Sequence, residues 1–218
     1  MDGKLSAPTL RRGAIVAAVM LCGWSLLGSW LREAWLLPSC AAAALALLWA
    51  YSFPPLRRSY QSGGAGLQAL GMGIVLPLVG WQLQGASLGE LLNGELGGWP
   101  MAAWLVPGVL MAWSGNWLTA IPDTESDAEG GKQTRPVRVG VTRTALEATA
   151  VCLLAGALSW GLLATWEPMP NILAGVCALC LIAHRLRRRS GASVLPFVLV
   201  SLGATTTVWL ALIAGLLS

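Results

Sequence analysis

Hydrophobic residues occur in long runs along this chain, separated by short polar segments. An α-helix of roughly 20 apolar residues is long enough to cross the hydrocarbon core of a bilayer. The pattern predicts seven such helices, the sixth of them short. They are expected at about residues 13–31, 35–53, 66–83, 100–120, 146–165, 170–184 and 193–217. The predicted fold class is an all-α membrane protein, with residues 1–218 forming a single membrane domain.

Composition supports a membrane location. The chain is 56% hydrophobic and only 11% charged, whereas a soluble globular domain carries about 25% charged residues. Its five cysteines lie inside predicted spans, where we interpret them as small packing residues rather than a disulfide framework.

The distribution of charge gives a second test of the span count. If the N-terminus faces the cytoplasm, all 14 basic residues except Arg32 fall on the cytoplasmic side. Acidic residues Glu33, Glu90, Glu95 and Glu167 then lie outside. This asymmetry follows the positive-inside rule and predicts a multi-pass protein, of the plasma membrane, with cytoplasmic polar loops. The net charge of +4 suits lipid headgroups and phosphorylated substrates, and no nucleic-acid-binding module is visible.

Two polar segments stand out from the apolar background. The first follows Tyr51, where two prolines end a predicted helix and bring Arg57 to the membrane surface. The second begins at Asn116 and carries Asp123 and Asp127, four residues apart. Carboxylates at that spacing share one face of a helical turn and can bind one divalent cation. Basic residues that could hold phosphate oxygens follow at once: Lys132, Arg135 and Arg138.

The second segment therefore predicts a site for a metal ion and a diphosphate. We count Asn116 among its substrate-binding residues. Trp113 and Trp117 lie one helical turn apart just before it. They could line a substrate cavity, although packing or an interfacial aromatic belt is the favoured interpretation.

These two segments resemble the UbiA-type intramembrane prenyltransferase superfamily. The tract from Tyr51 to Arg57, Y-S-F-P-P-L-R, is similar to a Y-S-x-P-P-L-R stretch of the superfamily. The tract from Asp123 to Gly140 is similar to its second aspartate-rich motif, D-x-x-x-D followed by G-K-x-T-x-P-V-R-x-G.

The resemblance implies a helical bundle with a cytoplasmic, Mg²⁺-dependent site. There an isoprenyl group would pass from a prenyl diphosphate to an aromatic or lipid-like acceptor. By this resemblance Asp123 and Asp127 would bind Mg²⁺. Lys132 and Arg138 would hold diphosphate oxygens, with Arg57 as a weaker candidate for the same role. Tyr51 would face the reacting carbon. The acceptor, the prenyl chain length and the oligomeric state stay open.

The chain also departs from the superfamily pattern. Members usually have more helices and an earlier N-D-x-x-D-x-x-x-D motif, whereas the only aspartates here are Asp2, Asp123 and Asp127. We therefore expect the domain to be short at its N-terminus, as a fragment or as a natural variant. One alternative is a non-catalytic or partner-dependent membrane protein with an incomplete diphosphate site. A transporter or channel is disfavoured, because ionisable residues lie at loop ends rather than in mid-span.

Overall fold

The computed structural model describes residues 7–85, 87–96 and 99–162. Five long helical segments dominate this part of the chain. They are α1 (Ala7–Arg32), α2 (Leu36–Ser52), the continuous run of α3 (Gly64–Leu70), η2 (Gly71–Val75) and α4 (Leu76–Leu83), then α6 (Leu105–Thr119) and α9 (Val141–Leu162). They correspond to the first five predicted spans, while the spans predicted at 170–184 and 193–217 lie outside the described residues.

The structure corrects several predicted boundaries. The fourth span was expected from residue 100, but a 3₁₀ turn, η3 (Met101–Trp104), precedes α6. The fifth was expected from residue 146, yet α9 begins at Val141. Gly140, at a φ of 84°, ends the short helix before it, and the chain turns directly into α9.

Membrane-spanning character is clear for three of these segments. Pro8–Arg32, Gly64–Leu83 and Val141–Ser159 are long and apolar enough to cross a bilayer, and Leu36–Ser52 is a shorter apolar helix. Several large apolar side chains on α1 are exposed; Trp24 is 66% exposed and Trp30 is 73% exposed. Such surfaces are expected where lipid, rather than water, surrounds a helix.

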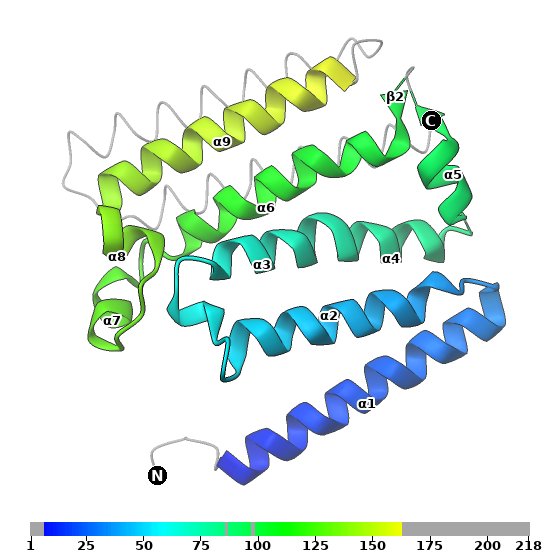
Figure 1. The fold of residues 1–218 in the computed structure, drawn as a ribbon, viewed down its shortest axis with the longest axis horizontal. Coiled ribbons are helices and arrows are strands. Elements are labelled where there is room, and N and C mark those ends of the chain that lie inside the picture. Colours follow the sequence, from blue (N-terminus) through cyan, green and yellow to red (C-terminus); the bar gives the residue numbers. More distant parts are fainter. Residues whose placement is uncertain (1–6, 86, 97–98, 163–218) are drawn as a thin grey trace.

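Successive helices run up and down beside one another, in the order α9, α6, α3–α4, α2 and α1 (Figure 1). At one end lie η1 (Arg58–Tyr60), α7 (Thr124–Glu129) and α8 (Arg135–Val139). At the other end lie the α1–α2 turn, α5 (Leu88–Asn93) and two short antiparallel strands, β1 (Glu95–Leu96) and β2 (Trp99–Pro100). Both polar segments therefore lie at the same end of the bundle, as the sequence predicted.

A glycine allows the central helices to approach closely. A Cβ atom added at Gly73, inside η2, would lie 2.4 Å from Val109 Cα and 2.8 Å from the carbonyl carbon of Gly108 on α6. No side chain fits in that space. Small residues permit this kind of backbone contact between membrane helices, and here they fix α6 against the middle of the α3–α4 segment.

Candidate active site

The two polar segments meet at one end of the bundle. The backbone N–H of Gln133 donates to the carbonyl oxygen of Tyr60 at 2.9 Å, which joins the segment after α2 to the segment after α6. Between them lies a polar pocket of about 240 Å³. It is lined by six of the eight polar residues that the sequence singled out: Tyr51, Asn116, Asp123, Asp127, Lys132 and Arg135.

The acidic segment is anchored by a small apolar core. After α6 ends, Ile121 is buried with Leu118, and both pack against Ala145 and Ala148 of α9. The Thr124 hydroxyl donates to the Ile121 carbonyl at 2.6 Å, and α7 begins there. The contacts fix the point at which the chain leaves the apolar bundle and turns toward the pocket.

Asp123 and Asp127 lie one helical turn apart, as their spacing predicted. The backbone N–H of Asp127 donates to the carbonyl oxygen of Asp123 at 2.7 Å, and Asp123 occupies the N-cap position of α7. The two carboxylates have different surroundings. Asp127 is only 5% exposed, whereas Asp123 is exposed and caps no backbone N–H with its side chain.

A buried carboxylate needs partners, because its desolvation is costly. Lys132 Nζ lies 2.6 Å from Asp127 Oδ1, and the Thr134 hydroxyl donates to Oδ2 at 3.2 Å. The hydrogen bond to Asp127 raises the pKa of Lys132 above its usual value, with a smaller opposing effect of burial. Lys132 is therefore a fixed cation at the pocket, held by the same acid that the sequence assigned to a metal ion.

The residues present fit a magnesium ion whose remaining ligands come from substrate and water. Mg²⁺ prefers oxygen ligands and is commonly bound through one or two carboxylates together with substrate phosphates, rather than by an all-protein cage. The pocket offers that donor set in Asp123 and Asp127. Within the described residues no group of three or more His, Cys, Asp or Glu side chains is placed to hold a metal.

Tyr51 enters the pocket from the last turn of α2. Helix α3 starts beside it at Gly64, where an added Cβ would lie 2.7 Å from the Arg58 carbonyl oxygen and 3.2 Å from Tyr51 Cε2. Only glycine lets the connection pass this close to the aromatic ring. The proline pair in this connection has a cis peptide bond between Pro54 and Pro55.

Two predicted residues do not line the pocket. Arg57 has a positive φ of 37° and stacks its guanidinium over the Tyr60 ring, 3.6 Å from the centroid. Arg138 is exposed in the last turn of α8. The structure therefore places both arginines near this end of the bundle but outside the pocket.

Sequence reasoning missed several polar residues that line the pocket. Gln68 of α3 accepts a hydrogen bond from the Asn116 side chain of α6, so the two helices contribute one joined polar group. Gln61 and Ser59 also line it. Gln68 could have been found, because it interrupts an otherwise apolar span.

Arg135, which the sequence analysis named with Lys132 and Arg138 as a residue that could hold phosphate oxygens, lines the same pocket. Its guanidinium pairs with Glu147 of α9 at 2.6 Å and lies 5.5 Å from the Trp117 ring centroid. Trp117 itself packs edge-on against Trp113, with 6.0 Å between centroids, and also lines the pocket. Trp117 thus contributes both to packing and to the pocket wall.

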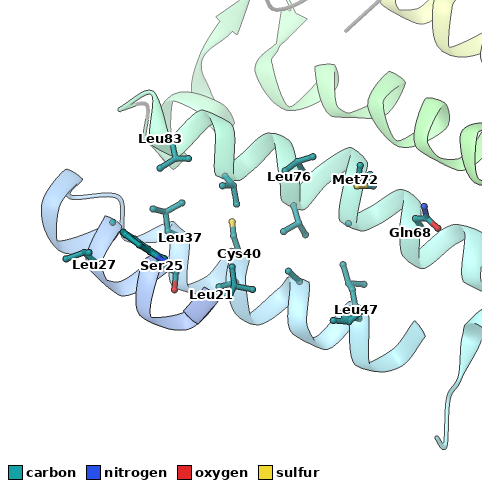
Figure 2. Close-up of a pocket in the computed structure, with 18 of the residues that line it drawn as sticks. Leu21, Ser25, Leu27, Leu37, Cys40, Leu47, Gln68, Met72, Leu76 and Leu83 are labelled. Carbon is teal, nitrogen blue, oxygen red and sulfur yellow. The ribbon is translucent and has the colours of Figure 1, made fainter. Parts of the chain in front are cut away.

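An apolar groove of about 830 Å³ adjoins this pocket. It runs between α1, α2 and the α3–α4 segment, with Leu37, Cys40 and Leu47 on one side facing Leu83, Leu76 and Met72 on the other (Figure 2). Tyr51 and Gln68 line both the groove and the polar pocket. The two cavities therefore meet at these residues, as a ligand with a polar head and a long apolar tail would require.

Comparison with protein families gives a match to the UbiA prenyltransferase family over residues 2–198. Comparison with curated proteins and with solved structures gives no match. The family consists of integral membrane enzymes of prenyl-lipid biosynthesis. Fold, apolar helices and motif positions agree with that match, and the chain belongs to the UbiA prenyltransferase family.

Proposed function

We propose that this protein transfers an isoprenyl group from a prenyl diphosphate to an aromatic or lipid-like acceptor in a Mg²⁺-dependent reaction. The observation that carries the proposal is the junction of two cavities at Tyr51 and Gln68. One cavity is polar and contains Asp123, Asp127 and Lys132. The other is apolar and extends away between three helices. A prenyl diphosphate has this same division between a charged head and an apolar tail.

The diphosphate would bind beside Lys132 and Arg135, whose charges complement its oxygens. Asp123 and Asp127 would hold Mg²⁺, which when bound would neutralise the charge that accumulates on the departing diphosphate. Lys132 donates hydrogen bonds to the same oxygens as the bond to the allylic carbon lengthens. Such fixed charges in a site with little water stabilise the transition state more than the ground state.

In the chemical step, the bond between the allylic carbon and the diphosphate oxygen breaks, and its electron pair leaves with the diphosphate. An electron-rich ring carbon of an aromatic acceptor, or a hydroxyl oxygen of a lipid-like one, would form the new bond to the allylic carbon. The proton that this atom loses would be taken up by a diphosphate oxygen. Tyr51 lies where the two cavities join, so its ring would face the allylic carbon. An aromatic face there stabilises developing positive charge and excludes water.

We further propose that the end of the bundle with the polar pocket faces the cytoplasm, in the plasma membrane. Arg57, Arg58, Lys132 and Arg138 lie in connections at that end, and basic residues concentrate on the cytoplasmic side of membrane proteins. Membrane lipids then surround the apolar helices, and the water-soluble head of the substrate reaches the pocket from the cytoplasm.

A non-catalytic or partner-dependent role is the second candidate. One observation favours it: in the described part of the chain, the pocket holds a single pair of carboxylates. Loss of one electrostatic element in an active site can lower the rate about 100–1000-fold. A chain with one acidic pair would then bind substrate yet turn it over slowly unless a partner supplied the missing charge.

Prenyl transfer measured in membranes that contain this chain would separate the two candidates. The assay would use labelled isoprenyl diphosphates, a panel of aromatic and lipid acceptors, and Mg²⁺ or EDTA. The test variant is Asp123→Ala/Asp127→Ala. The matched control is Glu125→Ala/Glu129→Ala, which removes two exposed acids of the same helix, α7, that do not line the pocket. Mg²⁺-dependent product that only the test variant loses would support catalysis. Substrate binding without product would favour the partner-dependent role.

A further inference from the structure

We infer that Glu147 of α9 is a positioning residue for the diphosphate site, because it holds the Arg135 guanidinium in place beside the polar pocket. Glu147 is not among the residues that line the pocket, so it acts through Arg135. The inference rests on the proposed function and adds to it a residue that the sequence pattern did not indicate.

Glu147 lies in a helix where an acidic side chain is costly. Three segments are long and apolar enough to cross a bilayer: Pro8–Arg32, Gly64–Leu83 and Val141–Ser159. Glu147 is the only aspartate or glutamate within them. An ionisable side chain in such a segment needs partners and commonly serves a function. Its partners therefore indicate what that function is.

The two carboxylate oxygens of Glu147 bind different arginines. Arg135 contacts Oε2 with both its Nε, at 2.7 Å, and its Nη2, at 2.6 Å. Arg143 donates from Nε to Oε1 at 3.0 Å, but its side chain is 69% exposed, and exposed ion pairs contribute little. Glu147 thus fixes one edge of the Arg135 guanidinium and leaves the Nη1 group for a ligand.

Trp117 holds the same guanidinium by its face. The Arg135 Cζ atom lies 5.5 Å from the centroid of the Trp117 ring, a distance at which a cation is attracted to an aromatic ring. Both residues line the pocket. With one edge and one face held, the guanidinium needs little further ordering when a diphosphate binds. Side-chain entropy that would otherwise be lost on binding is lost already in the folded protein.

A simple ion pair that joins α8 to α9 is the plainer interpretation of this contact. The two interpretations differ in their consequence for diphosphate binding when Glu147 loses its charge. By Coulomb attraction alone, removal of an acid near an anion site should strengthen binding of the anion. If Glu147 positions Arg135, the same change weakens binding, because the arginine side chain is no longer held at the pocket. The sign of the effect therefore separates them.

The test is equilibrium binding of radiolabelled inorganic diphosphate, with Mg²⁺, to the full chain in phosphatidylcholine nanodiscs. Inorganic diphosphate has no tail, so it reports on the polar pocket alone. The variants are Glu147→Gln, which keeps the size of the side chain, Arg135→Gln, and the two changes combined. The control Glu129→Gln removes one acidic charge from an exposed position of α7 that does not line the pocket.

We expect Glu147→Gln to weaken diphosphate binding about fivefold, and Glu129→Gln to change it less than about twofold. On the Arg135→Gln background, Glu147→Gln should have no further effect, since residues that act as one unit are not additive. Unchanged or tighter binding in Glu147→Gln, or a further loss in the combined variant from any cause, would overturn the inference while leaving the proposed function intact. If the parent chain bound no diphosphate at all, the proposed function would fail with it.

Discussion

Lys132 forms an ion pair with Asp127 at 2.6 Å inside the polar pocket. The sequence assigned these residues to two different ligands, Asp127 to the metal and Lys132 to the diphosphate. In the structure the Lys132 ammonium group and the Asp127 carboxylate are each other's ionic partner, and Asp127 is almost fully buried. Binding of a metal ion with its diphosphate would then exchange one set of ionic partners for another, so that no buried carboxylate is left unpaired.

The first prediction concerns the buried acid. Asp127→Asn removes the negative charge that balances both Lys132 and the proposed cation, so we expect prenyl transfer to fall about 100–1000-fold. The change keeps the shape of the side chain. The loss of activity would be measured from initial rates of prenyl transfer in membranes at saturating Mg²⁺. Glu129→Gln, on the same short helix but exposed, should stay close to the parent rate, and an equal loss in both variants would contradict the assignment.

The second prediction concerns the pKa of Lys132. The bond to Asp127 raises it, so the charged form is favoured in the folded protein. The stabilisation is fully present below the pKa of the unfolded chain, about 10.4 for a lysine, and is lost as pH rises through the raised folded value. Amine acylation followed by peptide mass analysis at about pH 9 to 10 should label Lys132 slowly. In Asp127→Asn labelling should speed up, and an unchanged rate would show that Asp127 does not hold the amine.

The third prediction separates two arginines that share one acid. Arg135 and Arg143 both bind Glu147, but only Arg135 lines the pocket. Arg135→Gln should weaken binding of a prenyl diphosphate about tenfold or more, since hydrogen bonds to charged groups contribute about 1.5–3 kcal/mol. Arg143→Gln should change it less than about twofold, because that side chain is exposed. Equal effects would place the diphosphate away from Arg135.

The fourth prediction concerns helix packing. Gly73→Ala places a methyl group 2.4 Å from Val109 Cα, and overpacking of this kind costs about 1–3 kcal/mol. We expect a lower midpoint of thermal unfolding in detergent. Gly66→Ala is the matched control in α3, because nothing lies within 4 Å of the added Cβ and alanine favours the helix. A similar loss in both variants would mean that the contact between η2 and α6 is not a tight one.

The hydrophobic pattern predicted the five long helical segments of the described residues, three of which are long and apolar enough to cross a bilayer. The charge pattern predicted that the two polar segments lie at the same end of the bundle. Both follow from properties that each residue carries locally, apolarity and charge. The predicted starts of the helices were less accurate. The fifth span was expected from residue 146, after the polar residues Thr142 and Arg143, whereas α9 begins at Val141. Backbone hydrogen bonds continue through such residues where the helix emerges from the apolar region.

The site could be predicted only in part. Asp123, Asp127 and Lys132 were recognisable because charge is rare in this chain and their spacing fits a helical turn. Gln68 was not predicted, because its place in the pocket depends on the packing of α3 against α6, where it accepts a hydrogen bond from Asn116. The groove could not be predicted, because it depends on how α1, α2 and α4 pack against one another. The hydrophobic pattern of a single helix does not determine that packing.

The central claim is that the diphosphate lies in the polar pocket and the tail in the adjoining groove. An electron cryomicroscopy structure of the protein in nanodiscs, with Mg²⁺ and the non-hydrolysable geranylgeranyl thiodiphosphate, tests it most directly. We predict phosphate density beside Lys132 and Asp127, and tail density in the groove between α2 and the α3–α4 segment. Phosphate density away from Asp127, or a tail lying outside the groove, would contradict the account.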